Sequence, residues 1–245
     1  MYTDSDNSYR TQLNELLEWI KDSQDSDKSR NRPFITLTYA QSLDGSIAAM
    51  DKTQLTLSGE ESFTLTHELR SLHSSILVGI KTVMADNPRL TVRLVPGNNP
   101  TPVILDTHGK ISPDAKVFQE QERNVLIVGS RKSGPFDTFY TTNNGYKKLY
   151  CETEESGLLD LNHLMSLLQN QNIESVMVEG GARVISNFLS AGLVDCLLLT
   201  ISPRLVGGYN ALSHYGLSQL GFKKSHFLSV GEDIVFWGCP EWKTA

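Results

Sequence analysis

The sequence predicts an α/β protein with a mostly parallel central sheet flanked by helices. Short apolar runs alternate, from about residue 34 onward, with segments whose apolar residues recur at helical spacing. This alternation is typical of strands joined by crossover helices. No internal repeat and no change of composition divides residues 33–245. We therefore expect these residues to form one domain.

The first element is expected to be an amphipathic helix over residues 8–21, because apolar side chains recur there at helical spacing. Residues 22–32 are too polar to pack, which predicts a linker or an exposed loop. The chain is thus divided into an N-terminal helix with a polar linker, residues 1–32, and the domain that follows.

Within the domain, strands are expected at residues 34–40, 75–79, 102–106, 125–129, 175–178, 194–201 and 233–237. Helices are expected at residues 59–73, 160–169 and 181–191. Asp160 suits the N-cap of the second helix, and Gly192 suits the end of the third. Thr82 is expected to open a helical turn, and a further strand is expected to carry Thr91 and Arg93 on one face.

Composition excludes several classes of protein. A net charge of −6 leaves no strong basic footprint for nucleic acid. Three widely spaced cysteines without a Cys-x-x-Cys pair argue against a disulfide scaffold and a structural zinc site, so no metal is expected. No apolar run reaches the roughly 18 residues of a membrane span, and the acidic N-terminus is unlike a targeting peptide. We expect a cytoplasmic protein with no nucleic-acid or membrane partner.

The string Glu179-Gly180-Gly181 follows one expected strand and opens a helix. Glycines at such a point let the backbone approach a phosphate, and the new helix offers free N–H groups and the positive end of its dipole. A tight strand-to-helix turn explains the string equally well. The pattern is not Gly-x-Gly-x-x-Gly, and no such fingerprint follows any expected strand, so a nicotinamide cofactor would need another binding geometry.

A second group of polar residues follows the strand that ends at residue 79. The Thr82 hydroxyl could cap its own turn or contact a pyrophosphate or a ribose, and Asp86 lies one turn further on the same face. Arg93 suits bidentate recognition of a phosphate. The alternatives are a turn residue for Asp86, which precedes Asn-Pro, and a solvated arginine for Arg93.

Other candidates are more isolated. Asp44 precedes a glycine in a tight turn after the first strand, where its carboxylate could bind polar substrate groups or transfer a proton. Ser130 and the two cations after it could bind a ribose 2′-phosphate, which would favour NADPH over NADH, or form a solvated loop. His67 is expected on the surface of its helix, whereas Arg70 lies in an otherwise apolar turn.

Taken together, these strings resemble the reductase family of riboflavin biosynthesis, and its free-standing fungal members most of all. The similarity runs from about Pro33 to the C-terminus, and the motifs occur in the same order as in the family. The most specific of them are Val-Gly-x-x-Thr-Val-x-x-Asp-Asn-Pro and Val-Glu-Gly-Gly. The matching segments are residues 38–45, 77–93, 102–106, 178–185 and 192–195.

The resemblance implies a dihydrofolate-reductase-like fold, a homodimer, and NADPH-dependent reduction in riboflavin biosynthesis. The implied reaction reduces the ribosyl group of 2,5-diamino-6-ribosylamino-4(3H)-pyrimidinone 5′-phosphate to a ribityl group. The residues that would contact the cofactor by motif are Ala40, Thr82, Asp86, Gly181, Ala182, Arg183 and Val184. Those that would line the substrate site are Arg70, Leu90, Arg93 and Glu179. The His-x-Glu and Pro-Cys-x-x-Cys set of a fused zinc deaminase does not occur, so deamination is expected elsewhere.

The expected mechanism begins when the ribosylamine opens to an imine, whose C1′ then accepts a hydride from the nicotinamide C4. Arg93 would anchor the phosphate, Glu179 would bind sugar hydroxyls or the cofactor edge, and Asp44 would handle a proton. Two other functions stay open at this point. One is reduction of a pterin, and the other is a nucleotide-binding regulator that binds NADPH without turnover.

Overall fold

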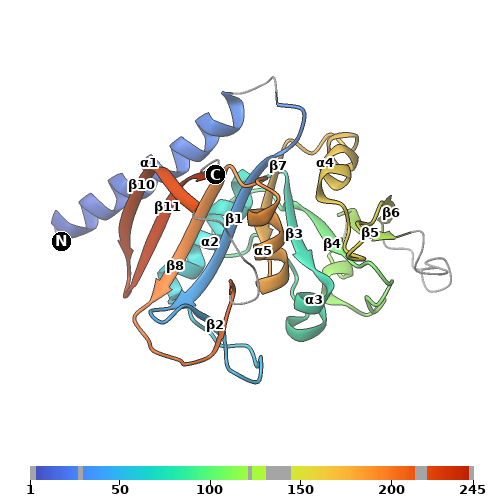
Figure 1. The fold of residues 1–245 in the computed structure, drawn as a ribbon. Coiled ribbons are helices and arrows are strands. Elements are labelled where there is room, and N and C mark those ends of the chain that lie inside the picture. The colour runs from blue at the N-terminus through green and yellow to red at the C-terminus, as the bar shows by residue number, and fades with distance from the viewer. Residues whose placement is uncertain (1–3, 27–29, 121–122, 131–144, 213–219, 243–245) are drawn as a thin grey trace.

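The computed structural model describes residues 4–26, 30–120, 123–130, 145–212 and 220–242 (Figure 1). Its main feature is a nine-stranded sheet with the order β10-β11-β8-β1-β7-β3-β4-β5-β6. These strands are β1 (Phe34–Ser42), β3 (Ser75–Gly79), β4 (Thr101–Leu105), β5 (Val125–Ser130), β6 (Tyr146–Cys151), β7 (Ser175–Glu179), β8 (Cys196–Ser202), β10 (Leu220–Val230) and β11 (Asp233–Trp242).

The strands from β8 to β6 pair in parallel with their neighbours, whereas β11 and β10 extend the sheet in the antiparallel sense. The helices are α1 (Asp4–Asp25), α2 (Glu60–Leu72), α3 (Ile80–Asp86), η1 (Lys116–Phe118), α4 (Leu161–Gln169) and α5 (Ala182–Ser190). A small second sheet pairs β2 (Ser46–Ala48) with β9 (Tyr209–Asn210). The predicted fold class, an α/β protein with a mostly parallel sheet flanked by helices, is confirmed.

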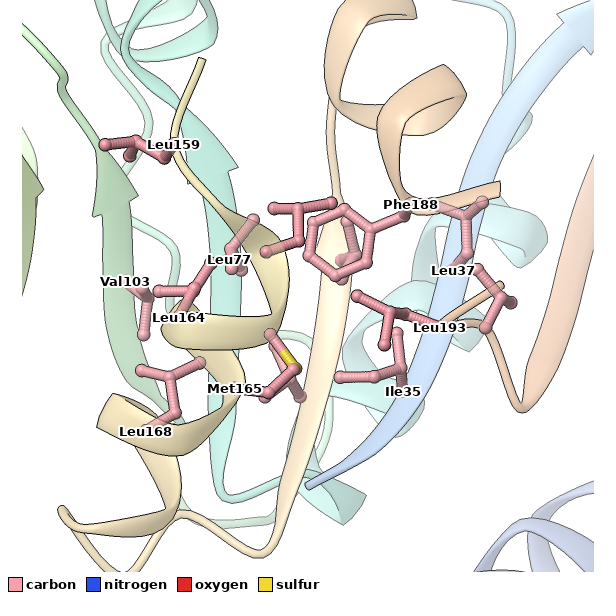
Figure 2. Close-up of a cluster of buried hydrophobic side chains, with 14 of the residues drawn as sticks. Ile35, Leu37, Leu77, Val103, Leu159, Leu164, Met165, Leu168, Phe188 and Leu193 are labelled. Carbon is pink, nitrogen blue, oxygen red and sulfur yellow. The ribbon is translucent and has the colours of Figure 1, made fainter. Parts of the chain in front are cut away.

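Helices cover both faces of the main sheet. On one face, α4 and α5 pack against β1, β3, β4 and β7, because each helix carries one apolar stripe and each of these strands is apolar on both sides. Figure 2 shows this cluster, with Leu164, Met165, Leu168 and Phe188 of the helices lying against Ile35, Leu37, Leu77 and Val103 of the strands. On the other face, α1 and α2 cover the β8–β11–β10 end and α3 covers the β3–β4 part.

The N-terminal helix is longer than predicted and packs on the body. It ends at Asp25, and its side chains Leu16 and Ile20 are fully buried against α2 and the antiparallel strands. The interpretation of residues 22–32 as too polar to pack is wrong at Arg32, whose guanidinium donates to both oxygens of Asp195 at 2.7 and 2.9 Å. The division of the chain at residue 33 stays a prediction.

Most predicted elements are present with ends that differ by one or two residues. The Asp160 side chain caps α4 as predicted, because it accepts from the backbone N–H groups of Asn162 and His163. The strand expected at Thr91 and Arg93 is wrong, since residues 87–93 form irregular backbone. Strands β6 and β10 were not predicted, because both are edge strands whose polar side chains interrupt the apolar pattern. Among the described residues, no helix is long and apolar enough to cross a membrane.

Candidate active site

A cavity of about 640 Å³ opens at the carboxyl ends of the central strands. Parallel register aligns Thr38 of β1 with Glu179 of β7, and Ala40 of β1 with Thr200 of β8, and all four residues line the cavity. This is the edge at which open α/β sheets bind ligands. Six of the predicted site residues line this cavity: Ala40, Arg70, Thr82, Asp86, Glu179 and Gly181.

Glycines bring the first turns of α3 and α5 together at one side of the cavity. A Cβ atom at Gly180 would lie 2.5 Å from Val184 Cβ, and one at Gly79 would lie 3.0 Å from Val184 Cγ2. Val184 can therefore pack close to both backbones only because neither position has a side chain. An added Cβ at Gly181 would lie 4.0 Å from Thr82 Oγ1, an ordinary contact distance, so Gly181 and Thr82 are neighbours at the cavity.

Helix α5 begins beside Thr82. Gly181 is its N-cap and provides no side-chain hydrogen bond, so the N–H groups of Ala182 and Arg183 are left for another acceptor, whereas the Val184 N–H donates to the Gly181 carbonyl at 2.9 Å. Of the three residues that follow, Ala182 is buried, Arg183 is exposed and Val184 is half-buried, and none of them lines the cavity. The uncapped helix start and the cavity that Gly181 lines beside it fit a phosphate group.

Thr82 and Asp86 lie one turn apart on α3 and both line the cavity. Partial burial raises the pKa of the Asp86 carboxyl above its ordinary value. Asn87, the next residue, ends the helix in the left-handed conformation, with φ of 43°, and its N–H donates to the Val83 carbonyl. Asp86 therefore belongs to the turn at the end of α3 and also lines the cavity.

Arg70 and Glu179 form a bidentate pair at the cavity wall. Arg70 Nε donates to Glu179 Oε1 and Nη2 donates to Oε2, each at 2.7 Å, and Nη1 donates to the Thr91 carbonyl at 3.1 Å. Burial alone would lower the pKa of Arg70, but the charge and hydrogen bonds of Glu179 outweigh burial and raise it. The two side chains are thus a fixed charged unit rather than independent ligands.

Side chains, rather than a β-ladder, hold the irregular segment of residues 89–93. Arg123 donates to the carbonyls of Leu90 and Arg89 at 2.7 and 2.6 Å. Leu90 is buried with φ of 56° and does not line the cavity. Arg93 is exposed, and its guanidinium lies 5.5 Å from the ring centre of Phe63, which does line the cavity.

His67 was expected on the surface, but its side chain is fully buried. Its Nδ1 accepts the backbone N–H of Arg93 at 3.0 Å, and its ring meets Phe63 edge-to-face at 5.4 Å. Burial, with Arg70 and Arg93 nearby, lowers the pKa of His67 to about 4. Arg93, whose N–H the histidine accepts, is 26 residues away in the sequence. Helical periodicity could therefore not indicate this contact.

Asp44 and Ser130 lie outside the cavity lining. The Asp44 carboxylate accepts from the Ser42 and Ser46 hydroxyls and from the N–H groups of Val206 and Gly207. The Ser42 hydrogen bond, then those of Val206 and Gly207, hold the pKa of Asp44 far below its ordinary range. This geometry favours the turn interpretation of Asp44.

Ser130 is buried at the end of β5, and its N–H donates to Thr107 O at 3.3 Å. The two cations predicted to accompany it lie outside the described residues. Within the described part of the chain, no group of three or more His, Cys, Asp or Glu side chains could hold a metal ion.

Sequence reasoning missed one wall of the cavity, which residues 54–59 and Phe63 form before and within the first turns of α2. The stretch reads Gln-Leu-Thr-Leu-Ser-Gly and directly precedes the expected helix. Nothing in this pattern indicated that it lines a cavity together with Glu179 and Thr82.

Fold and site together define the class: an α/β protein whose ligand cavity opens at the carboxyl edge of a mostly parallel sheet, beside an uncapped helix start. The chain belongs to the RibD C-terminal domain family, whose model matches residues 33–236. The resemblance predicted from the motifs is therefore confirmed.

Two curated relatives and one solved structure illustrate the similarity. The chain is 33% identical over 216 residues to the 2,5-diamino-6-ribosylamino-4(3H)-pyrimidinone 5′-phosphate reductase of Methanothermobacter thermautotrophicus, covering 83% of this chain and 96% of that protein. It is 37% identical over 186 residues to the Saccharomyces cerevisiae reductase of the same name, covering 71% of this chain and 74% of that protein. The structure of the S. cerevisiae riboflavin biosynthesis reductase Rib7 superposes with a TM-score of 0.75 at 29% identity, covering 93% of this chain and all of that one.

The family also contains longer proteins. The chain spans 58% of the length of the riboflavin biosynthesis protein RibD of Aquifex aeolicus, to which it is 29% identical over 214 residues.

Proposed function

We propose that this chain reduces the ribosyl side chain of 2,5-diamino-6-ribosylamino-4(3H)-pyrimidinone 5′-phosphate to the ribitylamino product in riboflavin biosynthesis. The relatives of that name support the reaction, one of them over 96% of its length. The observation that carries the proposal is a single cavity lined both by motif residues of the cofactor set and by motif residues of the substrate set.

NADPH is the proposed cofactor. The groups that would hold it are the first N–H groups of α5 after Gly181, the Thr82 hydroxyl and the backbone at Ala40, with Asp86 beside them. The cavity that Gly181 and Thr82 both line supports this assignment, because the uncapped start of α5 follows Gly181 directly. When bound, NADPH supplies the hydride that the substrate C1′ accepts.

The protein's own contribution is orientation and charge. Arg70 and Glu179 would face the sugar as a rigid pair, with the free lone pairs of the Glu179 carboxylate available to ribose hydroxyls. Arg93 would anchor the 5′-phosphate. In the part of the chain that the structure describes, no carboxylate forms an ion pair with the Arg93 guanidinium, which leaves it available to an anion.

The test follows NADPH absorbance with the purified full chain. The diaminated substrate, its deaminated counterpart and dihydrofolate are assayed side by side, each with NADPH and with NADH. We expect turnover of the diaminated substrate with NADPH. Turnover of dihydrofolate alone would favour a pterin reductase, and NADPH binding without any turnover would favour a nucleotide-binding regulator.

A homodimer in the cytosol is proposed as the working state. Two exposed apolar side chains, Phe227 and Ile234, lie on the antiparallel strands at one end of the sheet, which supports a partner there. All three cysteines are free thiols, as expected in a reducing compartment.

A further inference from the structure

One face of helix α2 holds the segment that carries Arg93. Phe63, His67 and Arg70 follow one another at spacings of four and three residues, which aligns them on one side of the helix. Each contacts this segment: the Phe63 ring faces the Arg93 guanidinium, His67 Nδ1 accepts the Arg93 N–H, and Arg70 donates to the Thr91 carbonyl.

The segment depends on such contacts because it has no strand or helix pairing of its own. Its other backbone hydrogen bonds to described residues are also to side chains: Arg123 donates to the carbonyls of Arg89 and Leu90, and the Val92 N–H donates to Asn99 Oδ1 at 2.7 Å. Backbone conformation at Arg93 is therefore set by the side chain that accepts its N–H. That side chain is His67.

A histidine at this position is not explained by packing alone. Because Nδ1 accepts a hydrogen bond, the proton of the neutral ring is on Nε2, and this buried atom has no partner among the described residues. An unpaired buried donor is unfavourable, and an apolar residue of similar size would avoid it. The acceptor at Nδ1 is thus the property that distinguishes histidine from leucine here.

Burial and the charged groups around the ring keep Nδ1 an acceptor. Burial is the largest effect that disfavours a cationic ring, and Arg70 on the same helix and Arg93 on the facing segment add to it, while Glu179 on β7 favours the cation. Together these effects lower the pKa of His67 to about 4. At neutral pH the ring is therefore uncharged and can accept the Arg93 N–H.

We propose that His67 is a positioning residue for substrate binding, whose Nδ1 fixes the Arg93 backbone so that the guanidinium lies over Phe63. Arg93 does not itself line the cavity, but Phe63 does, so the guanidinium is held next to the cavity for the substrate phosphate. The proposal rests on the proposed function, because it takes Arg93 as the phosphate anchor. It adds a residue that does not itself touch the substrate.

The test compares His67→Leu, which removes the acceptor, with His67→Asn, whose Oδ1 can replace Nδ1. His163→Leu is the matched control, because His163 Nδ1 also accepts a backbone N–H, that of Glu152 at 2.9 Å, on α4 outside the cavity lining. For His67→Leu we expect the KM for the substrate to rise about tenfold, with the KM for NADPH and kcat within about twofold of wild type. His67→Asn should recover most of the loss, and His163→Leu should behave as wild type.

A substrate without its 5′-phosphate separates positioning from general damage. For this dephosphorylated substrate, His67→Leu and wild type should have the same KM, since Arg93 then has no phosphate to bind. Equal losses with both substrates, or a parallel fall in kcat for NADPH-saturated enzyme, would overturn the proposal.

Amide hydrogen exchange keeps this inference separate from the proposed function. The Arg93 N–H should lose protection in His67→Leu and keep it in His67→Asn, whether or not the chain turns over the substrate. No turnover by wild type would overturn the proposed function and, with it, the substrate role of His67. Unchanged Arg93 protection in His67→Leu would overturn the positioning role itself.

Discussion

At the scale of single residues, the Arg70–Glu179 pair is the feature of the site with the largest expected effect on stability. The exposed fractions of the two side chains are 8% and 19%, so each charge is mostly removed from water and depends on the other. Breaking such a pair leaves one uncompensated charge, whereas removing both partners leaves none. The pair is therefore expected to be strongly coupled.

We expect Glu179→Gln to lower the free energy of unfolding by about 1–3 kcal/mol, and Arg70→Met by about 3–5 kcal/mol. The double variant should lose clearly less than the sum. Urea unfolding of the four proteins measures this coupling. Glu241→Gln is the control, because its pair with Lys223 is exposed to solvent and should contribute much less to stability than the buried pair. Additive losses at Arg70 and Glu179 would contradict the coupling.

At the scale of elements, the joint between α2 and the sheet depends on a second buried histidine. His73 ends α2, where its Nδ1–H donates to the Leu69 carbonyl and its Nε2 accepts from the Thr36 hydroxyl of β1, each at 2.7 Å. Burial lowers the pKa of His73 to about 4. The folded protein therefore resists a proton that the unfolded chain takes up near pH 6.5.

The consequence is a loss of stability on the acid side. The contribution of a neutral His73 is complete above about pH 6.5 and is lost as the pH falls towards 4, at up to about 1.4 kcal/mol per pH unit. His67 acts in the same direction, since its pKa is also lowered. Between pH 7 and 4.5, wild type should lose about 2 kcal/mol more unfolding free energy than His73→Gln. Equal losses, measured by urea unfolding, would show that His73 does not titrate in this way.

The elements also show what a single sequence can predict. Strands such as β3 and β7 are continuous apolar runs followed by glycine, and both their extent and their partner helices follow from that pattern. The segment of residues 89–93 could not be predicted in the same way. Its apolar and β-branched residues suit a strand, but its backbone is paired with Arg123, Asn99 and His67. Such distant contacts leave no periodic trace in a sequence.

For the site, too, local sequence strings were informative and contacts between distant residues were not predicted. Thr82, Asp86 and Gly181 were predicted from local strings, and the structure brings them to one cavity because their strands are neighbours in a parallel sheet. The mutual pairing of Arg70 and Glu179 was not predicted, since the two residues are 109 positions apart and each alone suits a substrate ligand. Assignment of these residues to cofactor and substrate stays a prediction.

At the scale of the whole molecule, the antiparallel end of the sheet is the surface most suited to a second copy of the chain. Figure 1 shows β10 and β11 at one end of the sheet, with β10 as the edge strand. The side chain of Phe227 on β10 is 67% exposed and that of Ile234 on β11 is 43% exposed. Phe227 also meets Phe236, its cross-strand partner, with ring centres 5.2 Å apart. Exposed apolar side chains beside an unpaired edge strand favour association unless they are covered.

Phe227→Asp should therefore weaken the proposed homodimer, because it introduces a charge into the surface that a partner would bury. We expect light scattering to give wild type a mass about twice the 27.3 kDa of one chain, and the variant a dissociation constant at least about tenfold higher. Met50→Asp is the control, since Met50 is a 71% exposed apolar residue that follows β2, which pairs with β9 in the small second sheet. A monomeric wild type would show that the dimer proposal is wrong, and a variant that associates as wild type does would move the interface to another surface.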